Sequence, residues 1–149
     1  MGPPDKAPIG LVVVRAAKTL NRAFEQALAE AGGSQAMWLT LLGLKVRPGS
    51  TQRQLAEDLG IREATMTHHL NGMERAGLVT RRRDPDNRRV HQIVVTDEGE
   101  ALFHRLRKAA VAFDQRLRSD IPEERIDDLA ETLRWLADNA GTLLRTLDA

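Results

Sequence analysis

Hydrogen-bonding side chains that could contact a nucleic acid are concentrated in the middle of the 149-residue chain. Residues 62–71 have a helical pattern, and one face carries Arg62, Thr65, Thr67, His68 and Asn71. Short polar groups beside one cation can hydrogen-bond to base edges in a DNA major groove. We therefore expect a recognition helix whose N-terminal residues reach deepest. Gln52, which belongs to the preceding helical segment, completes this candidate set.

A second basic cluster follows this segment, because residues 77–96 contain five arginines and two aspartates. We expect Arg88 and Arg89 to contact phosphates or a neighbouring minor groove. The run 81–83 has two interpretations, a DNA contact or a solvated strand. Side chains alternate along a strand, so we expect at least one of these three arginines to point away from DNA.

The hydrophobic pattern predicts the elements that position these residues. Helices are expected over 9–31, 35–45, 51–60 and 62–75, strands over 78–80 and 90–95 joined by 81–89, and two further helices after Thr96 and Pro122. Gly60 would form the turn, with Ala56 small at the helix crossing and Met66 beneath the second helix. The expected fold class is mostly α with a small β-hairpin wing (α+β), a winged helix-turn-helix.

We expect a flexible arm over residues 1–8, which contain three prolines. Residues 9–149 are predicted to form one domain, with a DNA-binding lobe over 34–96 and flanking dimerisation helices over 9–33 and 97–149. An apolar stripe in the first helix is formed by Val13, Ala17, Leu20, Phe24, Ala27 and Ala31.

The last helix carries a second apolar seam, formed by Leu129, Leu133, Leu136, Ala140, Leu143 and Leu147. Its 3.5-residue period is typical of helix pairing between chains. An intramolecular core is the alternative interpretation.

Composition excludes several classes of protein. The chain has no cysteine, which excludes disulfides, thiolate zinc sites and thiol nucleophiles. No apolar run is long enough for a membrane helix and no signal-peptide pattern is present, so we expect a cytoplasmic protein without membrane contact. With five aromatic residues and no tyrosine, a stacking platform for single strands is not expected. The net charge is +1, but residues 1–96 are basic and residues 97–149 are acidic.

The segments 51–60, 64–67, 73–79 and 84–96 together resemble the MarR family of bacterial transcription regulators. The resemblance extends over about residues 10–147. It implies a homodimer in which each subunit places one recognition helix and one wing on half of a palindrome. It also implies that Thr65, Thr67 and His68 belong to the DNA-contacting stretch and that Arg89 is the arginine of the wing tip.

The wing departs from the family pattern at one position. The family usually has aspartate two residues before the wing arginine, and Asn87 stands there in this chain. Asparagine accepts a hydrogen bond but supplies no charge. The wing is then either held more loosely or positioned by Asp86 instead.

Many members of the family release DNA when a small, often aromatic, anion enters a crevice beside the dimerisation helices. Trp38 could stack on such a ring, and Arg15 could bind its carboxylate. The competing interpretations are that Trp38 belongs to the core and that Arg15, Lys18 and Arg22 form a solvated face.

We expect a transcription regulator that acts as a repressor. An enzyme is not expected, because no paired carboxylates, Ser/His/Asp order or phosphate-binding glycine loop is present. No cofactor or metal is expected, because His68 and His69 point about 100° apart on a helix and lack a third ligand. The alternative function is a winged-helix module for protein interaction without specific DNA binding.

Overall fold

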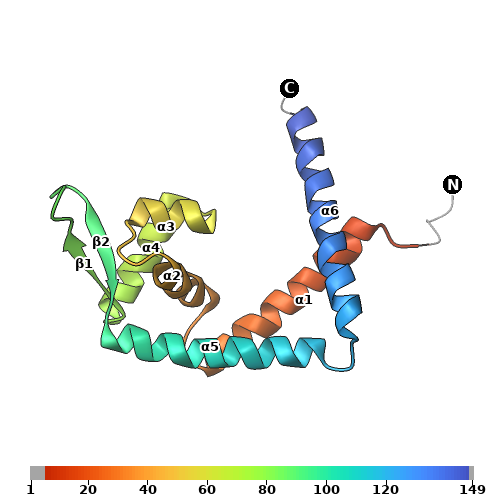
Figure 1. The fold of residues 1–149 in the computed structure, drawn as a ribbon, viewed down its shortest axis with the longest axis horizontal. Helices are drawn as coiled ribbons and strands as arrows, with labels where there is room; N and C mark the ends of the chain where they lie inside the picture. Colours follow the sequence, from red (N-terminus) through yellow and green to blue (C-terminus); the bar gives the residue numbers. More distant parts are fainter. Residues whose placement is uncertain (1–5, 148–149) are drawn as a thin grey trace. The chain divides into compact units, whose positions relative to one another are not determined.

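The computed structural model describes residues 6–147. In chain order its elements are α1 (Ile9–Glu30), α2 (Gln35–Val46), α3 (Gln52–Leu59), α4 (Glu63–Arg75), β1 (Val79–Arg83), β2 (His91–Val95), α5 (Asp97–Arg118) and α6 (Glu123–Leu147) (Figure 1). The predicted fold class is confirmed, since helices dominate and the two strands form one small antiparallel sheet. The chain divides into two compact units between Val111 and Ala112.

The helix-turn-helix is formed by α3 and α4, and local backbone chemistry fixes its turn. The Thr51 side chain accepts a hydrogen bond from the Gln54 N–H, and the Gln54 side chain accepts one from the Thr51 N–H. This reciprocal pair satisfies two backbone donors where α3 begins. α3 ends at Gly60, whose φ of 63° lies in the left-handed region that favours glycine. The predicted glycine turn is therefore confirmed.

Burial of one face of α4 determines which face is exposed. Met66 and Leu70 are fully buried and Met73 is 1% exposed, while Ala56 of α3 is 4% exposed. α2 contacts α1, α3, α4 and β2, which confirms its predicted place in the centre of the core. Its own buried side chains are Thr40, Leu41 and Leu44.

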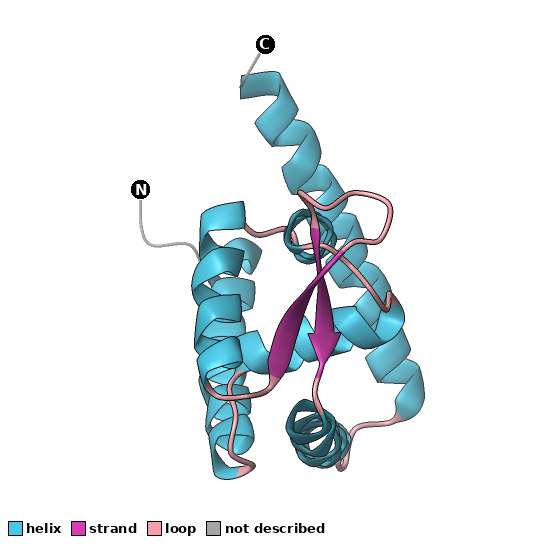
Figure 2. Ribbon diagram, turned by 90° about the vertical axis from the view of Figure 1, so that its left-hand side faces the viewer, coloured by secondary structure: helices cyan, strands magenta, loops and turns pink. Residues whose placement is uncertain are grey.

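The wing is the antiparallel pair β1–β2, which Figure 2 shows in magenta. Val79 pairs with Val95 and Arg83 with His91. The Ile93 N–H also donates to the Ser50 carbonyl over 3.0 Å, which ties β2 to the segment before α3. The prediction that the first strand ends at Thr80 is wrong. Three further residue pairs extend the ladder, so the arginines at 81–83 belong to the strand and the connecting loop begins at Asp84.

α5 begins in close contact with the end of α4. The Thr96 side chain accepts from the Gly99 N–H over 3.1 Å and donates to the Gly77 carbonyl, so it caps α5 as predicted. A Cβ atom at Gly99 would lie 2.1 Å from the Leu78 carbonyl oxygen. Only glycine permits this approach of α5 to the backbone that leads into the wing.

α1 differs from its predicted packing. Leu28 is its buried residue, although the predicted stripe omitted it, and Leu20 of that stripe is 43% exposed. Phe24 and Ala31 pack against the core. The difference arises because the C-terminal end of α1 meets the core of its own unit, whereas most apolar residues nearer its start are exposed.

The second unit contains the end of α5 and all of α6. Arg118 connects them, with ion pairs to Asp114 at 2.8 Å and to Glu123 at 2.7 Å, and these carboxylates raise its pKa. α6 has no buried residue among those described, and Leu129, Leu143 and Leu147 of the predicted seam are 53%, 67% and 82% exposed. These three leucines therefore form no core within the second unit itself.

Candidate nucleic-acid interface

The exposed face of α4 carries the residues predicted for base contacts. Thr65, His68 and Asn71 are exposed, and Arg62 is exposed at the N-cap of the helix. Thr67 is half-buried. These side chains lie opposite the apolar face formed by Met66, Leu70 and Met73, so burial of that face directs them outward.

Gln52 and Thr67 form a hydrogen-bonded pair between α3 and α4. The Thr67 hydroxyl donates to the Glu63 carbonyl over 3.0 Å and accepts from the Gln52 side-chain amide. Because a hydroxyl has a single proton to donate, the atom of Gln52 that faces it must be nitrogen. Two of the predicted contact residues are thus engaged with each other, and their pairing fixes α3 against α4.

Arg81 connects the wing to the recognition helix. Its Nη2 donates to Asn71 Oδ1 over 3.0 Å, and its Nη1 forms an ion pair with Glu74. The Arg81 side chain is 22% exposed, whereas Arg82 and Arg83 are exposed. Of the arginine run, Arg81 is therefore the one that contacts α4, whereas its strand neighbour Arg82 is exposed.

Asp84 organises the tip of the wing. Its carboxylate accepts from the Asp86 N–H over 2.8 Å and from the Gln92 side chain over 3.4 Å, and its own N–H donates to the Val90 carbonyl. The suggestion that Asp86 positions the wing is therefore wrong: Asp86 contributes a backbone donor to the turn. Asn87 accepts from the Arg89 N–H over 3.2 Å, so the asparagine serves as a local acceptor.

A groove of about 650 Å³ lies between the start of α3 and the wing. Gln52, Glu63, Arg81, Arg89 and His91 are among the side chains that line it. The structure therefore brings Gln52 and the wing arginine Arg89 to one surface, as a shared DNA contact requires. Arg88 lies beside Arg89 in the exposed loop.

The adjacent histidines are arranged differently from a metal site. Their ring centroids are 6.2 Å apart and the rings are tilted by 56°. His68 is exposed, whereas His69 is half-buried beside Ser34 and Met37. Within residues 6–147, no group of three or more His, Asp or Glu side chains could hold a metal ion.

The two residues predicted for a ligand site occupy separate places. Trp38 stacks on Phe103 of α5, with ring centroids 5.5 Å apart, and Lys45 lies 5.4 Å from the centroid of Phe103. Arg15 is exposed on α1, thirteen residues before Leu28, or roughly 20 Å along the helix axis. The structure therefore pairs Trp38 with Phe103, and Arg15 is an exposed residue in the first half of α1.

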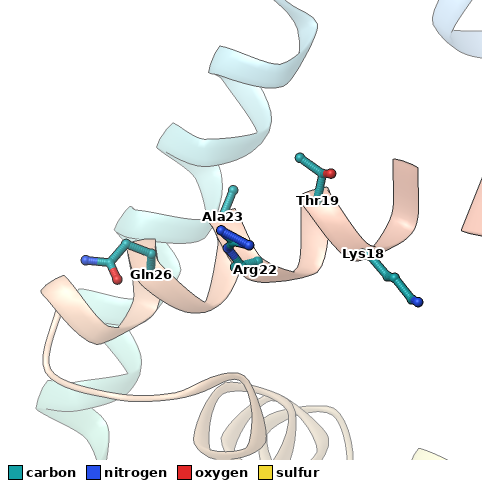
Figure 3. A pocket seen from close by; sticks show the side chains of 5 residues that line it. All are labelled: Lys18, Thr19, Arg22, Ala23 and Gln26. Carbon is teal, nitrogen blue, oxygen red and sulfur yellow. The ribbon is translucent and has the colours of Figure 1, made fainter. Parts of the chain in front are cut away.

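α1 also bears a basic hollow of about 530 Å³ (Figure 3). It is lined by Lys18, Thr19, Arg22, Ala23 and Gln26. Both cations are exposed, which is consistent with the interpretation of a solvated face.

Comparison with known proteins agrees with this geometry. The MarR family model matches residues 34–91. The transcriptional repressor CouR bound to a 23-mer DNA duplex is 30% identical, with a TM-score of 0.79 over 87% of this chain and 92% of that chain. CouR from Rhodococcus jostii RHA1 bound to p-coumaroyl-CoA is 26% identical, with a TM-score of 0.72 over 87% and 91% of the two chains. The MarR family transcription regulator SP03579 is 22% identical, with a TM-score of 0.85 over 92% and 91%.

A helix-turn-helix followed by an arginine-bearing hairpin defines a winged-helix protein with a DNA-binding fold. The chain belongs to the MarR family of transcription regulators. Its class is accordingly that of transcription regulators rather than enzymes. None of the helices in the described part of the chain combines the length and apolar character needed to cross a bilayer.

Sequence reasoning missed the roles of Arg81, Glu74 and Asp84. A signal for the first two was present: Asn71 and Glu74 are three residues apart on one helix face, and Arg81 shares the inward side of its strand with buried Val79. The role of Asp84 was missed because the sequence analysis considered only Asp86 and Asn87 as residues that could position the wing.

The hydrogen bonds of the wing tip predict that substitutions of Asp84 and of Asp86 will have different effects on amide exchange. Replacing Asp84→Ala removes an acceptor from the Asp86 N–H, and loss of about 1 kcal/mol there should accelerate amide exchange about fivefold. Asp86→Ala changes the same charge but keeps the Asp84 acceptor, so we expect exchange near the unmodified rate. Hydrogen–deuterium exchange of residues 84–90 measures both, and equal acceleration in the two variants would contradict the assigned role of Asp84.

Proposed function

We propose that this regulator is a homodimeric repressor that binds a palindromic operator. One recognition helix, α4, would enter the major groove of each half-site while the wing contacts the flanking backbone or minor groove. The observation that carries the proposal is the polar, exposed face of α4 beside the arginine-bearing wing. A module for protein interaction is expected to present an apolar or acidic face, and Arg62, Thr65 and His68 provide neither.

The side chains divide into two kinds of contact. Thr65, His68 and Arg62 project from the first half of α4 or its cap, so we assign them to base edges. Arg88 and Arg89 are cations on an exposed loop, so we assign them to phosphates or the minor groove. Gln52 and Thr67 would act at the same surface as a pair.

Dimerisation is supported by the apolar surface that each unit leaves exposed. α6 is a 25-residue helix with no described residue buried, and its leucine seam has the period of pairing between helices. α1 exposes Ile9, Val12 and Val14 at 59%, 46% and 52%. A second copy of this chain is the partner that would cover both helices, and it would also supply the second recognition helix that a palindrome requires.

A base contact and a phosphate contact should respond differently to truncation. His68→Ala should weaken binding to the cognate operator by about 1–3 kcal/mol and change binding to random DNA little. Arg89→Ala should weaken both and lower the salt slope by about 1, because one phosphate contact is lost. Fluorescence anisotropy across a salt series measures both quantities.

Matched controls lie on α5. His104→Ala and Arg107→Ala remove the same side chains from exposed positions outside α4 and the wing, so affinity and salt slope should be preserved. If Arg89→Ala behaved like Arg107→Ala, the wing assignment would be wrong. Loss of random-sequence binding in His68→Ala equal to the operator loss would contradict base reading by His68.

The α6 seam can be tested with two neighbouring substitutions. Leu143→Asp places a charge on the seam, where dimer burial would desolvate it, so dimer stability and operator affinity should fall together. Thr142→Asp adds the same charge about 100° away around the helix and should leave the dimer intact. Sedimentation at micromolar concentration measures assembly, and a stable monomeric parent protein would overturn the dimer proposal.

We also infer that a small anionic ligand with an aromatic group regulates DNA binding. The supporting observations are the stacked pair Trp38 and Phe103, with the Lys45 cation beside it, and the ligand named for CouR. Arg15 lies roughly 20 Å along α1 from Leu28, which belongs to the core cluster that Trp38 packs against, so an extended ligand such as a coenzyme A thioester suits both ends of this helix better than a short acid does. Release of DNA then requires that the ligand bind the conformation that cannot fit the operator more tightly than it binds the conformation that can.

Ligand length is therefore the variable to test. An extended aromatic acyl-coenzyme A should raise the melting temperature and weaken operator binding, and Arg15→Ala should reduce this response without changing operator affinity. Salicylate-like acids are much shorter than roughly 20 Å, so they should change the melting temperature and operator affinity of the parent protein and of Arg15→Ala equally. Calorimetric melting and anisotropy measure these effects, and a lack of response to either class of compound would leave Arg15 and Trp38 with structural roles only.

A further inference from the structure

We propose that Arg81 sets the hydrogen-bonding polarity of Asn71 and thereby the base preference of the recognition helix at that residue. The inference rests on the proposed function, in which α4 occupies the major groove. It assigns a specificity role to Arg81, a residue of the wing strand β1 that was not among the residues expected to contact bases.

The contact is defined by two elements. Asn71 and Glu74 lie three residues apart on α4 and therefore share a face. Arg81 extends from β1 on the same side as buried Val79 and divides its guanidinium between them, donating to Asn71 Oδ1 over 3.0 Å and to the Glu74 carboxylate. The ion pair with Glu74 anchors the guanidinium, so the hydrogen bond to Asn71 is offered from a fixed position.

The chemistry of the partners fixes the orientation of the amide. A guanidinium group has five donors and no acceptor, so the Asn71 atom that faces it must be the oxygen. Rotating the amide by 180° would oppose its NH₂ to the donors of Arg81. The NH₂ group is on the other branch of the planar amide and is therefore directed away from Arg81, on a residue that is exposed.

This polarity has a consequence for base reading. Asparagine recognises adenine when its oxygen and nitrogen both face the base edge, accepting from N6 and donating to N7. With one lone pair of its oxygen engaged by Arg81 and its NH₂ directed away from Arg81, Asn71 presents chiefly donors to an approaching base. In the major groove, guanine offers the acceptors O6 and N7 and thymine offers O4, whereas cytosine offers only the N4 donor. Asn71 should therefore select guanine or thymine over cytosine.

A purely structural clamp is the competing interpretation of the same contacts, because the ion pair with Glu74 alone would join wing and helix. The two interpretations differ in one observable. A clamp changes stability and overall affinity, whereas a polarity-setting residue changes the frequency of bases at one operator position.

The experiment is selection of bound duplexes from a randomised DNA library, followed by sequencing. The parent protein should enrich guanine or thymine over cytosine at one position in each half-site. Arg81→Met should reduce that ratio by at least about fivefold, because a good base contact discriminates by that factor or more. Arg82→Met is the matched control: the neighbouring exposed arginine carries the same charge on the opposite side of β1, so affinity should fall without a change in the ratio.

A second variant tests the same role even if the Arg81→Met protein fails to fold. In Asn71→Asp, Arg81 would hold one carboxylate oxygen and the other would be an acceptor, so the preference should shift toward cytosine at the same position. Unchanged base frequencies in both Arg81→Met and Asn71→Asp would overturn the role of Arg81. Failure of the parent protein to enrich any motif would instead overturn the proposed operator binding on which the inference rests.

Discussion

Burial of the inner face of α4 is the constraint on which the rest of the interface depends. Met66, Leu70 and Met73 are removed from water against α2 and α3, and a helix that buries one stripe must expose the opposite one. Thr65, His68 and Asn71 are presented outward for this reason. The hydrogen bonds from Gln52 to Thr67 and from Arg81 to Asn71 then refine the orientation of side chains that the core has already directed to the surface.

The parts of the fold that could be predicted are those controlled by local chemistry. Gly60 is in the left-handed region, Thr51 forms a capping box and Ser34 accepts from the Met37 N–H, and each of these signals operates within four residues. Helix limits followed accurately because caps and glycines define them. The first strand was predicted too short because arginines have little strand preference of their own. Pairing with His91–Val95 extends β1 through Arg83, and that pairing is not local.

The same distinction between local and non-local interactions separates the predictable from the unpredictable parts of the candidate site. The outward face of α4 follows from its hydrophobic period, so its residues were identified from sequence. Arg81 appeared as one of three equivalent cations, and only the packing of β1 against α4 distinguishes it from Arg82. The buried position of Leu28 was likewise missed, because the long apolar pattern of α1 contains residues for more than one partner and the sequence does not say which the chain itself supplies.

The direction of the hydrogen bonds therefore explains this candidate interface better than the number of charged residues does. Arg81 carries the same charge as Arg88, yet its guanidinium is committed to Glu74 and Asn71 while Arg88 lies in the exposed loop. An arginine whose charge is compensated by a nearby carboxylate adds little to the long-range attraction of phosphates. Its remaining effect is to define which atoms a neighbouring amide presents. Our proposals therefore assign affinity for any DNA and preference for one sequence to different arginines of a single short hairpin.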